Sequence, residues 1–131
     1  MSSETKTYDT RFFFEHYYSD DDSTLDLTRE ELRAKQRKYI SSIVLHEVYK
    51  LTLEKDGRSV AELRTKLLEK DFNIIAVDAK IARISAEYRH KYRIPLADSI
   101  VAATAKITGT KCVTDDQHIR QIREIRTSWI K

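Results

Sequence analysis

Carboxylates occur at four places in the sequence where they could act together. Asp9 and the pair Asp115–Asp116 each follow a predicted strand, whereas Glu47 and Asp98 lie in predicted helices. In an open α/β sheet, sites form in the crevice outside the carboxyl ends of the strands. Helices packed on the sheet can reach the same crevice, so we expect these side chains to converge there.

A cluster of carboxylates requires a cation, because like charges held close together repel one another. Oxygen ligands in an incomplete protein cage suit Mg²⁺ or Mn²⁺. Such an ion polarises a phosphoryl oxygen and lowers the pKa of a bound water molecule. The pattern therefore predicts metal-assisted hydrolysis of a phosphodiester.

Each carboxylate also has a purely structural explanation. Asp9 and either member of Asp115–Asp116 could cap helices, because aspartate is a preferred N-cap residue. Asp98 could stabilise the first turn of a helix through the helix dipole. Glu47 is different, because mostly apolar residues surround it at helical spacing and its burial without a partner would cost roughly several kcal/mol. It needs a metal, or an ion pair with Lys50 or a distant arginine.

A sheet must position these side chains, and the sequence contains five strand candidates. They are 5–8 (TKTY), 40–45 (ISSIVL, which could run into a helix), 72–77 (FNIIAV), 111–114 (KCVT) and 126–130 (RTSWI). Residues 72–77 are apolar on both faces, as in a strand buried between helix layers. Residues 5–8 are polar for a central strand. Helices between the strands predict a parallel sheet covered on both faces.

Capping residues mark the expected helix boundaries. Thr28 could start a helix after the acidic loop 19–22, and Gly57 could end the helix that contains Glu47. Ser59 could cap the next helix in a capping box. A further helix is expected over 115–125, after the strand 111–114.

The stretch IPLADSIVAATA (94–105) is the most apolar in the chain, yet it contains Asp98. As a helix opened by Pro95, it places Asp98, Val101, Ala102 and Ala105 on one face. A face built for burial therefore begins with an acid.

Composition limits the class of protein. The 131 residues are 40% hydrophobic, which allows one domain (1–131) with its own core. A single cysteine rules out an internal disulfide and favours a reducing, cytoplasmic setting. No apolar run of about 18 residues is present, and the N-terminus MSSETKTYDT lacks a secretory pattern, so no membrane segment is expected. The net charge of +3 only weakly suggests a polyanionic partner.

The other metal-ligating side chains are His16, His46, His90, His118 and Cys112. They show no ligand spacing with one another, so zinc is not expected. His118 is expected to face solvent, and Cys112 to be a small core residue of a strand.

Four segments together resemble the PIN-domain ribonucleases, specifically the VapC-type toxins of prokaryotic toxin–antitoxin pairs. They are YDTRFFFEHY (8–17), SSIVLHEVYKL (41–51), IPLADSIVAATA (94–105) and VTDDQHI (113–119). The resemblance covers nearly the whole chain. It rests on the order of an Asp-Thr pair, a helical glutamate, a Leu-Ala-Asp motif and a Thr-x-Asp motif.

The resemblance implies which residues form the site. The catalytic and metal-binding residues would be Asp9, Glu47, Asp98 and Asp116. The Thr-x-Asp spacing of the family favours Asp116, with Asp115 as the alternative.

Three neighbouring residues take secondary roles. Thr114 resembles the small polar residue that orients the site, and Thr10 follows the first acid as in the family. Arg11 stands where many relatives carry Asn or a small residue, and it could bind phosphate instead. The acidic loop 19–22 is not part of the family motif.

The resemblance further implies a three-layer α/β/α sandwich with four to five strands, Mg²⁺- or Mn²⁺-dependent cleavage of RNA, and a homodimer. It also implies a small antitoxin protein whose tail enters the active-site groove. The RNA target and the antitoxin stay open.

Two other classes of protein fit the pattern less well, a silent binding module and an aspartate-based phosphotransfer protein. A catalytically silent PIN-like module that binds RNA or protein would not need all four acidic positions filled. An aspartate-based phosphatase would carry a second Asp at position 11, and a receiver domain would place its acidic pair far earlier than Asp115–Asp116.

Overall fold

The computed structural model describes residues 4–131. Residues 1–3, which begin the N-terminal segment considered above as a secretory signal, lie outside the described residues. Its strands are β1 (Lys6–Tyr8), β2 (Lys38–Ser41), β3 (Asn73–Ile75), β4 (Lys111–Val113) and β5 (Thr127–Ser128). Its helices are α1 (Thr10–Tyr18), α2 (Asp22–Arg33), α3 (Ser42–Asp56), α4 (Arg58–Asp71), α5 (Ala79–Tyr92), α6 (Leu96–Thr108) and α7 (Gln117–Arg120).

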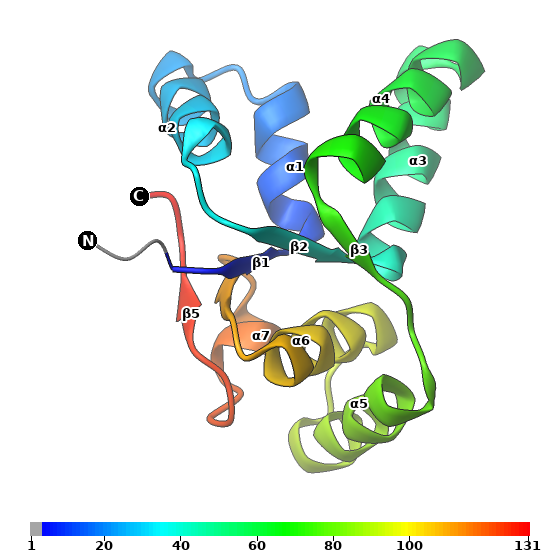
Figure 1. Ribbon diagram of the computed structural model, residues 1–131, viewed down its shortest axis with the longest axis vertical. Coiled ribbons are helices and arrows are strands. Elements are labelled where there is room, and N and C mark those ends of the chain that lie inside the picture. Colours follow the sequence, from blue (N-terminus) through cyan, green and yellow to red (C-terminus); the bar gives the residue numbers. More distant parts are fainter. Residues whose placement is uncertain (1–3) are drawn as a thin grey trace.

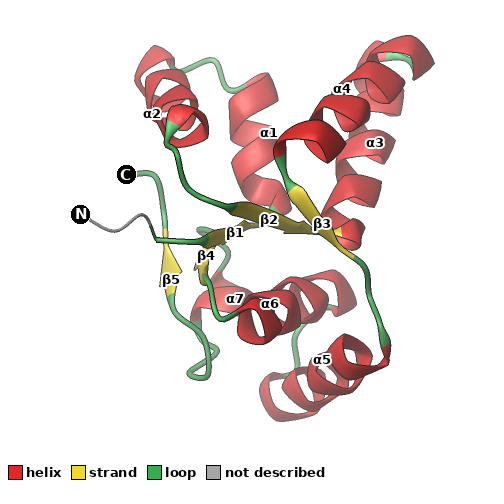
Figure 2. Cartoon of the chain, in the orientation of Figure 1, coloured by secondary structure: helices red, strands yellow, loops and turns green. Residues whose placement is uncertain are grey.

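The strands form one parallel sheet in the order β3-β2-β1-β4-β5. Helices α1 to α4 lie on one face of this sheet, and α5, α6 and α7 lie on the other (Figure 1; Figure 2). The predicted α/β fold, with a parallel sheet between two helical layers, is therefore confirmed. Among the helices of residues 4–131, none combines the length and the apolar character needed to cross a bilayer.

The central strand is β1, although its sequence is polar. Its side chains find partners inside the fold: Lys6 forms an ion pair with Glu31 at 3.0 Å, and the hydroxyls of Thr7 and Thr110 are 2.5 Å apart. Tyr8 is fully buried. Pairing of buried polar groups removes the cost of burying them, so a polar segment can occupy the centre of the sheet.

Strand β3 corrects one expectation. The apolar run 72–77 was predicted to be buried on both faces, but β3 covers only Asn73–Ile75 at the edge of the sheet. Asn73 is exposed, and Ile74 and Ile75 are half-buried. A short apolar run does not distinguish an edge strand from a central one, because the order of the strands is set by the whole chain.

Two helix starts also differ from the sequence predictions. Helix α2 begins at Asp22 rather than after Thr28, because the Asp21 carboxylate caps it by accepting from the Thr24 N–H at 3.1 Å. The acidic loop 19–22 thus serves to start a helix. Helix α4 begins at Arg58, directly after Gly57, so Ser59 does not cap it. Gly57 has φ of +88°, a conformation that glycine adopts readily, and it ends α3 as predicted.

The remaining helix boundaries agree better. Segment 40–45 is a strand that runs into a helix, since β2 passes directly into α3. Helix α6 begins after Pro95 and ends at Gly109, as predicted. The helix expected over 115–125 is confined to α7, four residues long.

Each face of the sheet has its own packing. Tyr8, Phe12, Phe13 and Phe72 form an aromatic cluster in the core on the α1 side of the sheet. On the other face, Val101, Ala102 and Ala105 of α6 are buried, as the sequence pattern indicates. Small residues let α6 pack closely, which brings its first turn to the edge of the sheet.

Candidate metal-binding site

The carboxyl ends of β1 and β4 meet at the centre of the sheet. Tyr8 pairs with Val113, and the N–H of Asp9 donates to the carbonyl oxygen of Val113 at 3.1 Å. The chain leaves β1 toward the α1 face and reaches β4 from the α6 face (Figure 1). These two strands therefore flank the topological switch point, where α/β folds form their sites.

Asp9 is held in place by two hydrogen bonds. Its Oδ1 accepts from the backbone N–H of Thr10 at 2.8 Å, and its Oδ2 accepts from the Thr114 hydroxyl at 2.6 Å. Asp9 is thus also the N-cap of α1. The side chain is buried, and burial raises its pKa to about 7, against the opposing effect of the Thr114 hydrogen bond. The nearby charge of Asp98 also raises this pKa.

Glu47 lies in the second turn of α3 and is half-buried. Its Oε1 accepts a hydrogen bond from the Thr10 hydroxyl at 2.5 Å. Lys50, one of the partners considered from the sequence, instead pairs with Glu54 at 2.8 Å. Thr10 therefore links Glu47 to the first turn of α1, and the carboxylate keeps a second oxygen for another partner.

Asp98 and Asp116 approach each other from two different elements. Asp98 is in the first turn of α6, and Asp116 is the N-cap of α7. The pKa of Asp98 is raised to about 6. Burial is the largest cause, the charge of Asp116 is the next, and the charge of Glu47 has a smaller effect in the same direction. A carboxyl whose pKa is raised by burial and by neighbouring acids is typical of a functional site.

The two adjacent acids after β4 have different partners. Asp115 forms a two-bonded ion pair with Arg11, with Nε–Oδ1 at 3.0 Å and Nη2–Oδ2 at 3.3 Å. Asp116 instead lies with Asp98. The carboxylate that approaches Asp98 is therefore Asp116, and Arg11 is engaged with Asp115 at the rim.

Thr114 joins two of these acids through one hydroxyl. The hydroxyl donates to Asp9 Oδ2 and accepts from the backbone N–H of Asp116 at 3.0 Å. Thr114 is itself buried. Its single oxygen atom thus sets the position of Asp9 relative to the loop that carries Asp116.

His118 is the residue of this region that sequence reasoning missed. It is exposed, as expected, but one ligating atom from each of Asp98, Asp116 and His118 lies within 4.8 Å of the others. Ligand spacing in the sequence relates the histidines only to one another and to Cys112, which is buried in β4. One local feature does point to His118: it follows Asp116, the N-cap of α7, by two residues.

The donor set fits a divalent cation. Asp98, Asp116 and His118 have ligating atoms within 4.8 Å of one another, and this group does not include Asp9 or Glu47. Burial is the largest cause of the raised pKa of Asp9 and of Asp98; the charges of Asp98 and Asp116 add to it at Asp9, and those of Asp116 and Glu47 add to it at Asp98. The ligand type is mainly oxygen, which suits Mg²⁺ and Mn²⁺.

Removal of the Asp98 charge should stabilise the metal-free protein in a pH-dependent way. A carboxyl with a raised folded pKa stabilises the fold below its ordinary pKa of about 4, and this contribution is lost as pH rises through about 6. In EDTA, Asp98→Asn should therefore be closest to the wild type near about pH 3.5, below both pKa values, and should exceed it near about pH 8 by about 1–2 kcal/mol after allowance for solvent screening. Urea unfolding of both proteins at the two pH values measures this gap, and a gap independent of pH would contradict the prediction.

Comparison with known proteins adds a family and a fold. The family model described as the PIN domain matches residues 7–125. No curated protein matches the chain.

Solved structures with the same fold include three from toxin–antitoxin systems. DNA-bound VapBC from Salmonella typhimurium matches with a TM-score of 0.79 and 17% identity, over 98% of this chain and 100% of that chain. VapBC2 from Rickettsia felis, bound to a promoter DNA fragment, matches with 0.77 and 18%, over 95% and 98%. VapC20 from Mycobacterium tuberculosis, described as a Sarcin-Ricin loop cleaving toxin, matches with 0.73 and 16%, over 92% and 98%. At these identities the likeness concerns the fold.

Proposed function

Because the chain belongs to the PIN-domain family, we propose that it is a metal-dependent endoribonuclease and the toxin of a VapBC-type toxin–antitoxin pair. The approach of Asp98, in the first turn of α6, and Asp116, the N-cap of α7, carries this proposal. Carboxylates brought together in a crevice at the switch point are what a divalent cation requires.

The residues divide into those that hold the cation and those that position them. Asp9, Glu47, Asp98 and Asp116 would hold Mg²⁺ or Mn²⁺. When bound, the ion polarises a phosphoryl oxygen and lowers the pKa of its bound water. Thr114 and the backbone of Thr10 orient Asp9, and the hydroxyl of Thr10 orients Glu47.

Arg11 is proposed to contact the phosphate backbone of RNA. Its side chain is 46% exposed and lies two residues after Asp9, at the rim of the site. Pairing with Asp115 holds the guanidinium in one place, so it can contact a phosphate without a large loss of side-chain freedom.

The related structures support the proposed antitoxin partner. Two of those structures are of VapBC, and another is a toxin–antitoxin complex from Klebsiella pneumoniae. We propose a small antitoxin as the partner of this chain, a homodimer as its assembly and the cytoplasm as its location.

The alternative is a catalytically silent PIN-like module that binds RNA or protein. Such a module has no need for acids whose pKa is raised by burial and by neighbouring carboxylates, as at Asp9 and Asp98. The presence of these two acids beside Asp116 therefore favours the nuclease.

Cleavage assays with and without metal test the proposal. One structured RNA and one single-stranded RNA are incubated with the protein in Mg²⁺, in Mn²⁺ and in EDTA. We expect cleavage with either metal and a loss of about 10³-fold or more in EDTA, since the ion contributes several kcal/mol of transition-state stabilisation. Equal cleavage in EDTA would contradict metal dependence. Absence of both cleavage and Mn²⁺ binding by calorimetry would favour the silent module.

A further inference from the structure

His118 lies beside the carboxylate site although the Thr-x-Asp motif itself does not include it. It is in the first turn of α7, and its backbone N–H donates to Asp116 Oδ1 at 2.7 Å. This bond ties the orientation of the Asp116 carboxylate to the residue that carries the imidazole. Helix α6 brings Asp98 to the same place, so the three side chains come from two elements on one face of the sheet.

The distances suit ligands of one ion. Two oxygen ligands at about 2.1 Å on opposite sides of an ion are about 4.2 Å apart. One ligating atom from each of Asp98, Asp116 and His118 lies within 4.8 Å of the others, so small side-chain rotations bring all three to a shared ion. His118 is exposed, and its imidazole can rotate without disturbing the core.

We propose that His118 supplies a nitrogen ligand to the cation held by Asp98 and Asp116, and that this ligand makes the site prefer Mn²⁺ to Mg²⁺. The inference rests on the proposed metal site. Mg²⁺ strongly prefers oxygen ligands and loses its water reluctantly, whereas imidazole binds first-row transition metals. A site of oxygen ligands alone would not discriminate in this way.

Spectroscopy of bound Mn²⁺ tests the ligand directly, without an activity assay. Electron spin echo envelope modulation of the Mn²⁺-loaded full chain should show ¹⁴N modulation from a coordinated imidazole. His118→Ala should remove this modulation. Calorimetry should show that the same change raises the Kd for Mn²⁺ about tenfold and the Kd for Mg²⁺ by less than about threefold.

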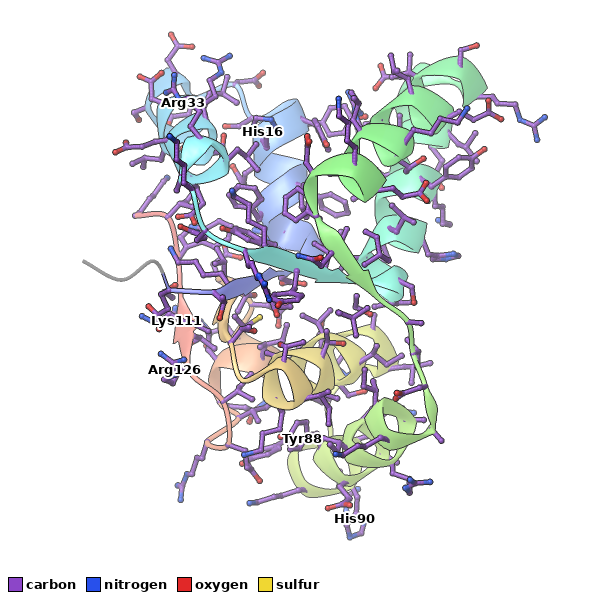
Figure 3. The ribbon with its side chains drawn as sticks, viewed as in Figure 1. His16, Arg33, Tyr88, His90, Lys111 and Arg126 are labelled. Carbon is purple, nitrogen blue, oxygen red and sulfur yellow. The ribbon has the colours of Figure 1, made fainter. Side chains whose placement is uncertain are left out.

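Two further variants separate a ligand from a general effect of the substitution. His118→Asp keeps a ligand but replaces nitrogen with oxygen, so it should bind Mn²⁺ without ¹⁴N modulation and with a reduced preference over Mg²⁺. His90→Ala is the matched control, because His90 is exposed on α5 and points away from the sheet (Figure 3). Its spectrum and affinities should equal those of the wild type.

The outcomes distinguish this inference from the proposed function. Mn²⁺ binding without ¹⁴N modulation in the wild type, or modulation that persists in His118→Ala, would overturn the role of His118 and leave the carboxylate site standing. Failure of the wild type to bind Mn²⁺ at all would overturn both.

Discussion

Asp98→Asn is expected to reduce RNA cleavage by about 10³-fold or more, because it removes a charged ligand of an ion that contributes several kcal/mol to transition-state stabilisation. One carboxylate oxygen of Asp98 lies within 4.8 Å of one of Asp116. Asparagine has nearly the same shape, and Asp98 is only half-buried, so the fold should be retained. Initial cleavage rates in Mn²⁺, together with circular dichroism of both proteins, measure the effect.

A surface carboxylate provides the control for this change. Asp26 of α2 is 79% exposed, and its nearest cationic partner is Arg29 at 3.9 Å. Asp26→Asn also replaces a carboxylate with an amide. It should leave the cleavage rate within about twofold of the wild type, since exposed ion pairs contribute little. Unchanged cleavage by Asp98→Asn, or an equal loss in both variants, would contradict the assignment of Asp98.

Thr114→Val is expected to weaken Mn²⁺ binding by about 10- to 100-fold and to reduce cleavage by a similar factor, because residues that orient metal ligands have effects of this size. The hydroxyl donates to Asp9 at 2.6 Å and accepts from the Asp116 N–H at 3.0 Å. Valine has a similar volume but leaves a buried carboxylate oxygen without its donor. We therefore also expect a loss of stability of about 1–3 kcal/mol. Calorimetry with Mn²⁺ and urea unfolding measure the two effects.

Two variants show whether the hydroxyl itself is responsible. Thr114→Ser keeps the hydroxyl and should restore Mn²⁺ affinity to within about threefold of the wild type. Thr104→Val removes another buried threonine hydroxyl, one that donates to the carbonyl oxygen of Ile100 within α6. It should leave Mn²⁺ affinity unchanged. If Thr114→Ser were as defective as Thr114→Val, the effect would come from packing.

The general architecture follows from local patterns in the sequence. Alternation of strand and helix signals predicts the parallel sheet and its two helical layers, because parallel strands need crossover helices. The apolar face of residues 94–105 predicts the packing of α6, and Val101, Ala102 and Ala105 are indeed buried. The positions of Asp9 and Asp116 near strand ends are local features as well. Asp9 directly follows β1, and Asp116 lies shortly after the end of β4.

Other features depend on contacts between distant residues. The order of the strands places β3 at an edge, although its apolar sequence resembles that of a central strand. Central β1 is polar, and it is accommodated because Thr7 meets Thr110 and Lys6 meets Glu31. Neither pairing is visible to a search for periodicity, which considers only neighbours along the chain.

The same distinction applies to the site. By itself, the sequence determined that acids follow the first and fourth strands and occur in two helices, because residue type and spacing are local properties. Only the tertiary structure decided that Arg11 engages Asp115, so that Asp116 is the acid that lies beside Asp98. It also decided that His118 joins them. The physical reason is that ion pairs and ligand geometry depend on distances between side chains, and packing of α1, α6 and α7 at the sheet sets those distances.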